Sequence, residues 1–405
     1  MMPLGKPARI LRACALLACL GAQTAAADNP VSVGSVEMDS ESGVPAVLGD
    51  VDDTLEEKVG PQPEQDGAQE KERNWEPVIA PLPSRNSAFG WMLSVPAMIM
   101  YKPSFSDPGD QVWITGVFGF YAENDSWGAG AMQRMSFGGD KWRVKGGLFH
   151  MDFNYKYYGI GGDGSGRYIT LDQDMDMFMA EGLRRVAPSF YIGLKGVYGQ
   201  TEVGPRLPED VELPPILDPD RLKADLTLST LAPRLQYDTR DAEFYPRTGW
   251  FVDATAFISR ESFGADLEYE RYEASANQYW PLGENGVLAS RLASKYVSSS
   301  APFFIYPAFG QEADLRGYQM GSYRDQFLIA GQSEYRHRFT DRIGAVAVAG
   351  VGSVSPDFLG WEKTLWSVGA GFRWVVAPKN DISLRLDVAR GRDETIYYVG
   401  VGEAF

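Results

Sequence analysis

Cysteine is almost absent from this sequence. The two cysteines among its 405 residues, Cys14 and Cys19, both lie near the N-terminus. Residues 1–27 combine a basic start, an apolar run of about ten residues and small residues at Ala25 and Ala27, which is the pattern of a secretory signal peptide. We expect cleavage after Ala27, so the mature chain has no cysteine for a disulfide or a metal site. Lipidation at Cys19, in the stretch LLAC, is the alternative.

Long hydrophobic runs and basic charge are also scarce. No run approaches the roughly 20 apolar residues that a transmembrane helix needs. Lysine and arginine number 38 against 54 acidic residues, and the net charge of -16 becomes -19 when Lys6, Arg9 and Arg12 leave with the signal peptide. Nucleic-acid binding depends on clustered basic side chains, so we expect no nucleic-acid partner.

Residues 28–74 form an acidic segment with few apolar side chains. Its 47 residues carry 13 acidic and 3 basic side chains, a balance of -10, and are rich in proline and glycine. Such a composition cannot bury enough apolar surface to offset the entropy lost on ordering. The segment is therefore predicted to be a disordered arm in the periplasm.

From residue 75 to residue 405, segments of about ten residues alternate apolar side chains with small or polar ones. A strand of a soluble sandwich would also alternate. Here, however, charged side chains occupy the polar face, and aromatic residues gather at segment ends, as at 279–280 and 397–398. An apolar outer band, aromatic girdles and a polar interior are typical of an outer-membrane β-barrel.

The pattern predicts about 16 antiparallel transmembrane strands, the first at 75–82 and the last at 395–405. Short turns alternate with long loops, as expected for this class of barrel. An even number of strands returns the end of the chain to the periplasm. The long loops are expected at 156–171, 203–221, 300–325 and 354–364.

Catalytic motifs are lacking, and no enzymatic activity, cofactor or metal site is predicted. His150 shares a strand face with Asp152, which raises the possibility of an outer-membrane hydrolase. No serine-bearing or second acidic constellation accompanies the pair, and a lumen histidine bonded to its neighbours is the alternative.

Three passages carry a family resemblance. They are YDTRDAEFYPRTGWFVDATAF at 237–257, ADLRGY at 313–318 and the terminal YYVGVGEAF at 397–405. Together they resemble the BamA/TamA superfamily of outer-membrane barrels, which includes two-partner secretion translocators and surface-antigen proteins. The resemblance covers residues 75–405. The short acidic arm stands where members usually carry POTRA domains, which suggests the subgroup that lacks them.

The resemblance implies that the loop at 300–325 folds back into the barrel lumen. In the family, an arginine at the tip of this loop pairs with acids on the lumen face of the strands that follow. The acid that alternation places on that face here is Glu334, while Gly350 stands where the family usually has aspartate, so Asp387 or another acid is an alternative partner. The residues expected to anchor the loop are Leu315, Arg316, Gly317, Tyr318 and Glu334.

The first and last strands are expected to form a weak seam. Proline removes a backbone donor from a strand, and glycine weakens one through entropy and missing contacts. Relatives are thought to open at this place, while an irregular first strand or pairing with a second protomer are alternatives. The residues expected at the seam are Pro77, Ile79, Pro81, Val399, Gly400 and Gly402. A barrel-assembly signal is expected at Tyr398, Gly400 and Phe405.

The resemblance implies a bacterial outer-membrane barrel that assists the insertion or passage of a macromolecule. The expected partners are outer-membrane lipid, a substrate polypeptide or lipid, and a second copy of the chain. A passive pore is one alternative, because barrels of this size can leave an aqueous channel. A structural barrel that acts through homo-oligomeric contacts is another.

Overall fold

The computed structural model describes most of the chain from Trp75 onward. The expected signal peptide at 1–27 and acidic arm at 28–74 lie outside the described residues. The described residues are 75–79, 81–86, 89–157, 159–160, 168–206, 223–310, 313–319, 321–377 and 381–405.

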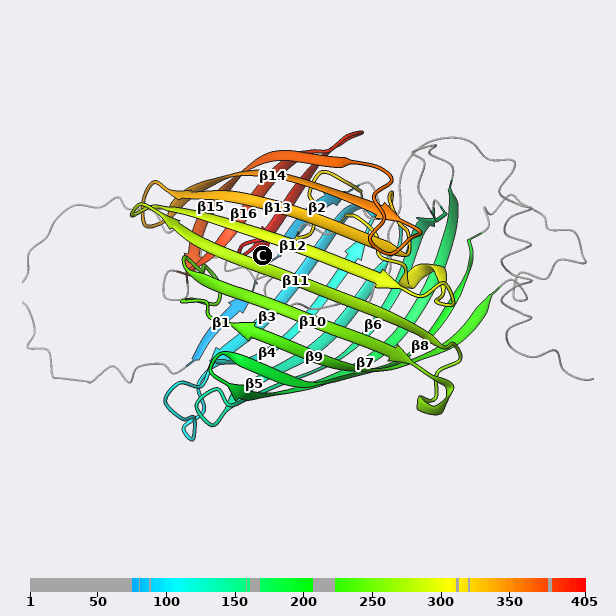
Figure 1. Ribbon diagram of the computed structural model, residues 1–405, viewed down its shortest axis with the longest axis horizontal. Coiled ribbons are helices and arrows are strands. Elements are labelled where there is room, and N and C mark those ends of the chain that lie inside the picture. Colours follow the sequence, from blue (N-terminus) through cyan, green and yellow to red (C-terminus); the bar gives the residue numbers. More distant parts are fainter. Residues whose placement is uncertain are drawn as a thin grey trace, which may run out of the picture.

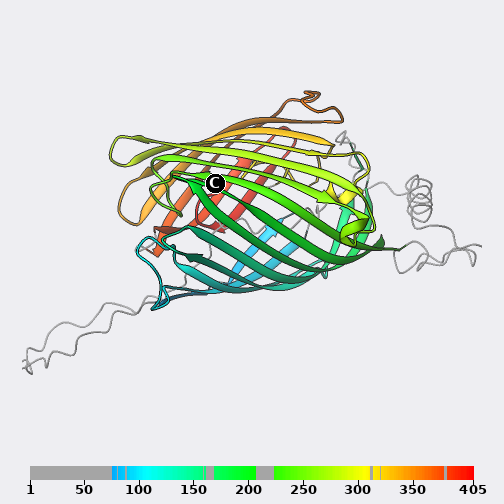
Figure 2. The same cartoon turned by 60° about the horizontal axis from the view of Figure 1, so that its bottom comes forward.

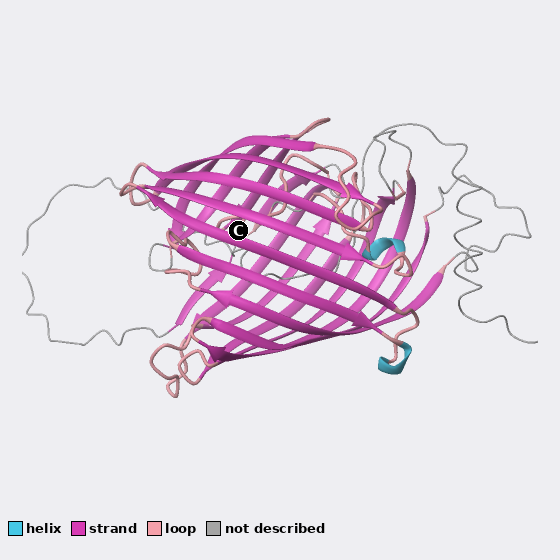
Figure 3. Cartoon of the chain, in the orientation of Figure 1, coloured by secondary structure: helices cyan, strands magenta, loops and turns pink. Residues whose placement is uncertain are grey.

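Nearly all of the described chain is β-structure (Figure 3). Two short 3-10 helices, η2 (Glu261–Phe263) and η3 (Phe303–Ile305), interrupt it, and no helix in the described ranges is long and apolar enough to cross a membrane. The strands are β1 (Trp75–Ile79), β2 (Leu82–Asn86), β3 (Gly90–Tyr101), β4 (Trp113–Ala122), β5 (Trp127–Phe137), β6 (Trp142–Tyr157), β7 (Ile169–Ala187), β8 (Phe190–Pro205), β9 (Ala224–Asp238), β10 (Gly249–Ser259), β11 (Tyr269–Leu282), β12 (Gly286–Val297), β13 (Phe327–Arg338), β14 (Ile343–Ser355), β15 (Leu365–Ala377), β16 (Ile382–Arg390) and β17 (Thr395–Val401).

The strands pair antiparallel with their neighbours in the chain and curl into a barrel (Figures 1 and 2). β1 and β2 share one strand position, because both pair with β3 in a single continuous register: Ile79 lies opposite Ala97 and Leu82 opposite Ser94. The 17 strand segments therefore occupy 16 positions. The predicted all-β antiparallel barrel is confirmed.

The two ends of the series of strands meet at β17 and β2, which are neighbours in the strand order. Among the described strands, this junction is less extensive than any other between neighbours. The predicted last strand, 395–405, is wrong in its end point, since β17 stops at Val401. Gly402 has φ 73, a left-handed conformation that suits glycine, and it turns the chain inward.

Connections of different length separate the two ends of the barrel. Short turns join β5 to β6 and β7 to β8 at one end, called here the turn end. The predicted connections at 300–325 and 354–364 lie at the opposite end, called here the loop end, on the right of Figure 1, while most of those predicted at 156–171 and 203–221 lies outside the described residues. The hairpin tip between β16 and β17, Gly391–Glu394, also lies at the loop end.

The inner wall of the barrel is polar in one part and apolar in another. Buried charged side chains such as Arg336 and Arg373 line it toward the turn end. Toward the loop end, apolar side chains of β6 to β9 form one packed cluster, which includes Phe149, Met175 and Leu228. The polar interior expected from the sequence is therefore wrong for this half, where the wall packs against the connection between β12 and β13.

Candidate functional site

The connection between β12 and β13, residues 298–326 and called here the lumen loop, folds into the barrel. Its tip is fully shielded from solvent: Leu315 and Arg316 are 0% exposed and Tyr318 is 1% exposed. Leu315 and Tyr318 pack in a cluster with Leu328 and Val354 of the barrel wall. A loop buried in this way needs partners for its polar groups.

Arg316 finds those partners on two strands of the wall. Its Nη2 pairs with Oε1 of Glu334 on β13, the acid that alternation placed on the lumen face. Its Nε lies 3.5 Å from Oδ2 of Asp387 on β16, and its main-chain N–H donates to Oε1 of Gln332 at 3.1 Å. Two carboxylates thus surround one buried guanidinium, which offsets part of the cost of removing these charges from water.

Gly350 on β14 makes room for the loop. A Cβ at this position would lie 2.6 Å from Cδ1 of Leu315 and 2.9 Å from the main-chain oxygen of Gly331. An aspartate here would therefore collide with the packed leucine. Asp387 on β16 stands beside Arg316 as its second acid.

A second layer of charge lies below Arg316, toward the turn end. Arg336 Nε donates to Glu334 Oε2 at 2.8 Å, and Arg373 links Asp387 to Glu403 through contacts of 2.5 and 2.8 Å. Glu403 lies in the inward-turned segment that follows β17. These residues continue the network from the loop anchor to the end of the chain.

Phe405, expected at the end of the last strand as part of a barrel-assembly signal, lies beyond β17 and inside the barrel. It is 3% exposed and packs with Tyr245 and Tyr279, and its main-chain oxygen accepts a hydrogen bond from Arg336 Nη2 at 2.6 Å. The apolar contacts and the charged network hold this segment in the lumen. The expectation that the last strand extends through Phe405 is corrected accordingly.

The lumen loop is also bonded to the hairpin tip, Gly391–Glu394. Gln319 N–H donates to Glu394 Oε1 at 2.8 Å, Arg392 N–H donates to the Tyr318 hydroxyl at 3.2 Å, and the Tyr323 hydroxyl donates to Asp393. Burial raises the pKa of Glu394 to about 7. The loop and the hairpin tip thus form one hydrogen-bonded unit.

Tyr398 connects the lumen loop to β17 itself. Gly317 N–H donates to the Tyr398 hydroxyl at 2.7 Å. Gly317 has φ 86, and a Cβ there would lie 2.5 Å from the main-chain nitrogen of Gly391, so glycine is required for this close approach. Gly317, expected to anchor the loop, is therefore hydrogen-bonded to Tyr398, expected in the last strand.

The seam residues named from the sequence are divided between two places. Pro77 and Ile79 lie in β1, opposite Ile99 and Ala97 of β3, and the strand breaks before Pro81. The neighbour of β17 is β2, which was not singled out.

On the other side of the seam, Val399 and Gly400 lie in β17 and Gly402 follows it. A Cβ on Gly400 would lie 2.6 Å from Arg385 Nη2, so this glycine makes room for a guanidinium of β16.

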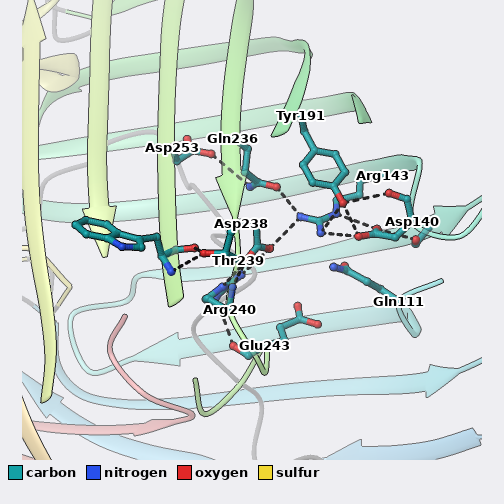
Figure 4. Close-up of polar contacts among 12 residues, drawn as sticks. Gln111, Asp140, Arg143, Tyr191, Gln236, Asp238, Thr239, Arg240, Glu243 and Asp253 are labelled. Atoms are coloured by element: carbon teal, nitrogen blue, oxygen red, sulfur yellow. Dashed lines mark hydrogen bonds and ion pairs between the residues drawn. The ribbon is translucent and has the colours of Figure 1, made fainter. Parts of the chain in front are cut away.

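A polar network at the turn end, shown in Figure 4, was not predicted. It gathers around Arg143 of β6, whose guanidinium binds both carboxylate oxygens of Asp140 at 2.9 and 2.6 Å. Its Nη1 also donates to Gln236 at 2.7 Å and to Asp238 at 3.1 Å. The Tyr191 hydroxyl donates to Asp140 Oδ2 at 2.7 Å, below the guanidinium that covers its ring. The network ties β6, β8 and β9 together.

The passage 237–257 builds the other half of this network. Asp238 accepts from Arg240 at 3.0 and 3.3 Å, and Glu243 pairs with Arg134 of β5. Burial opposes ionisation of Glu243, but Arg134 more than offsets it and holds the pKa of this carboxyl below its usual value. Alternating Asp, Arg and Glu in the quoted passage were the signal that could have indicated this network.

His150 lies on the outer face of the barrel, because its neighbours Phe149 and Met151 point into the lumen cluster. Its Nδ1 is 3.0 Å from Oδ1 of Asp176 and its Nε2 is 3.8 Å from Oδ2 of Asp174. The lumen position expected as one alternative for this histidine is wrong.

Comparison with known proteins decides the family. Residues 130–390, more than half of the chain, match the Omp85 superfamily domain. The chain belongs to the Omp85 superfamily. No curated protein matches the sequence. The resemblance read from the three sequence passages is confirmed.

Solved structures of Omp85-like barrels share the fold. BamA from Haemophilus ducreyi, in a form lacking POTRA domains 1–3, aligns with 81% of this chain and 70% of its own at 14% identity and a TM-score of 0.55. CdiB from Escherichia coli aligns with 81% and 62% at 13% identity and a TM-score of 0.56. CdiB from Acinetobacter baumannii aligns with 81% and 65% at 10% identity and a TM-score of 0.51. The chain spans less than two thirds of either CdiB structure.

Proposed function

We propose that this outer-membrane barrel assists the insertion or passage of a macromolecule, a polypeptide or a lipid, and that it does so by opening between β2 and β17. Membership of the Omp85 superfamily supports the class of function. The observation that carries the proposal is the direct bonding of the lumen loop to β17 through Tyr398 and the hairpin tip. A movement of β17 would therefore disturb the loop that folds into the lumen.

The anchored lumen loop favours this function over a passive pore. Leu315, Arg316 and Tyr318 are buried against the wall, and Arg316 is held by two carboxylates. A general pore of this strand number would keep an open aqueous channel. A solute would have to displace this anchored loop before it could diffuse through.

Weak pairing supports the site of opening. The strand position beside β17 consists of two short segments, β1 and β2, with Pro81 in neither, and the contact of β2 with β17 is the least extensive among neighbouring strands described. In hydrocarbon, an unpaired backbone group costs several kcal/mol, so strand edges exposed by opening at this junction need a new pairing partner. A substrate strand or a second protomer would supply that pairing.

Cysteine crosslinking tests the opening, because the mature chain otherwise has no cysteine. The sequence suggested the pair Ile79→Cys and Val399→Cys. Because β2 is the neighbour of β17, the pairs to test combine Val399→Cys with single cysteines at each position of Leu82–Asn86. We expect that oxidation closes the seam and abolishes rescue of cells depleted of the protein, scored by their outer-membrane protein and lipid content.

A pair across a strand junction that stays closed is the matched control. Leu386→Cys and Val399→Cys lie opposite each other on β16 and β17. Their crosslink should leave rescue intact. Complete crosslinking between β2 and β17 with full rescue would show that the barrel works without opening there, and the proposal would be abandoned.

A further inference from the structure

Two arginines of the lumen loop are buried, but only one of them has a counter-charge. Arg316 is 0% exposed and lies between Glu334 and Asp387. Arg324 is 2% exposed and forms no ion pair with any carboxylate of the described residues. Its Nη1 donates to the main-chain oxygen of Phe303 at 3.1 Å, and its Nε has no hydrogen-bond acceptor.

Asp325, the residue that follows Arg324 in the sequence, does not form an ion pair with it. Asp325 Oδ1 accepts the main-chain N–H of Gln326 at 2.8 Å instead. The guanidinium lies 5.6 Å from the ring centre of Tyr157, and burial lowers the pKa of Arg324 because no carboxylate opposes it. Arginine nevertheless stays protonated in proteins, so a positive charge is buried here without a counter-charge from the described residues.

The surroundings of Arg324 are apolar. Tyr155, whose hydroxyl is close enough to interact electrostatically with the guanidinium, belongs to the cluster that lines the loop end of the lumen. This cluster, called here the apolar chamber, also takes in Phe304 and Ile305 of η3. A cavity of about 40 Å³ remains beside η3, lined by apolar side chains that include the flexible Met175 and Met177 and, among polar ones, by Thr230 and Arg271.

We infer that the apolar chamber binds an amphiphile whose anionic head group, a carboxylate or a phosphate, pairs with Arg324. The head group supplies the counter-charge that the chain itself does not, in a charge-assisted hydrogen bond to the free Nε. The alkyl chain takes the place of η3, whose Phe304 and Ile305 occupy the chamber in this structure. The inference does not depend on opening between β2 and β17.

Native mass spectrometry of the full barrel in a neutral detergent tests whether the chamber binds an anionic amphiphile. The probes are dodecyl phosphate, dodecanoate, dodecanol and inorganic phosphate. We expect one copy of an anionic alkyl probe to bind, and Arg324→Met to weaken it at least about tenfold while leaving dodecanol unaffected. Arg324→Lys should retain most of the affinity. The tighter of the two anionic probes identifies the head group as carboxylate or phosphate.

Arg260→Met is the matched control, because Arg260 also lies at the loop end but pairs with Glu270 in a more exposed position. It should leave binding unchanged. A second readout needs no ligand: Arg324→Met should raise the unfolding temperature, since it removes an unpaired buried charge. Equal affinity of wild type and Arg324→Met for the anionic probes would overturn the inference. Inorganic phosphate binding as tightly as dodecyl phosphate, or an equal loss in Arg260→Met, would do the same.

Discussion

Arg316 should stabilise the folded lumen loop more than a surface arginine would, because both of its acidic partners are buried with it. Removing one partner of a buried ion pair costs about 3 to 5 kcal/mol, since the remaining charge loses its compensation. Arg336 and Arg373 still contact those acids, which places the expected loss for Arg316→Ala at about 3 kcal/mol. Urea unfolding of the barrel and protease resistance of residues 298–326 measure it.

An exposed pair supplies the comparison for this variant. Arg260→Ala removes a partner of Glu270 outside the lumen and should cost only about 0 to 1 kcal/mol. If Arg316→Ala were as mild as Arg260→Ala, and left the loop equally resistant to protease, the loop would not be anchored by this arginine.

Gly350 should be intolerant of even one added carbon. Its Cβ would approach Leu315 Cδ1 to 2.6 Å and a neighbouring main-chain oxygen to 2.9 Å. We predict that Gly350→Ala destabilises the barrel by about 1 to 3 kcal/mol, the usual range for overpacking. Leu315→Ala in the same chain should recover part of this loss in a double-mutant cycle. Independent, additive losses would show that the two residues do not contact each other.

The individual contacts were only partly predictable from the sequence. Period-two alternation was sufficient to put Glu334 on the lumen face, because the face of each side chain follows from its parity in the strand. The requirement for glycine at position 350 could not be predicted from the sequence, because it depends on the packing of Leu315 from the lumen loop. The lack of a counter-charge at Arg324 likewise emerges only when the loop is folded.

The contact between the lumen loop and the hairpin tip should depend on pH through Glu394. Burial raises the pKa of this carboxyl to about 7, so the folded state binds the proton more tightly than the unfolded chain, where the pKa is about 4.3. The stabilising contribution is therefore largest at low pH and is lost as pH rises from about 4.3 to about 7. We predict greater protection from amide exchange for residues 313–319 one unit below pH 7 than one unit above it, after correction for intrinsic exchange.

Glu394→Gln should remove this pH dependence, because the amide keeps an acceptor for Gln319 N–H and does not titrate. Glu362→Gln, at an exposed position on the neighbouring connection, is the control and should leave the pH dependence as in the wild type. Protection that changes with pH equally in Glu394→Gln would assign the effect to another group.

Strand identity was easier to predict than strand ends. The alternation at 381–391 and 326–339 matches β16 and β13, whereas β17 stops at Val401 although the apolar pattern runs on to Phe405. The end point is set by Gly402 and by burial of Glu403 with Arg373, contacts between distant segments. The break between β1 and β2 was indicated by the prolines, but the choice of β2 as the neighbour of β17 was not.

The barrel as an assembly combines a lumen loop anchored by buried charges with a junction of limited contact, and hydrogen bonds join the two. The fold class followed from alternation, turn lengths and aromatic girdles, because these report on the membrane directly. The apolar chamber could not be predicted from the sequence, because alternation does not distinguish an apolar inner face covered by a loop from a lipid-facing one. The lumen loop packs against this chamber with η3 and against the opposite part of the wall with its tip.

Planar-bilayer conductance measures most directly whether the anchored lumen loop restricts the passage of ions through this barrel. We expect small, fluctuating currents for the wild-type protein and larger, steadier ones for Arg316→Ala, with Arg260→Ala behaving as the wild type. Large and steady currents from the wild-type protein, unchanged in Arg316→Ala, would contradict this expectation and identify the barrel as an open pore.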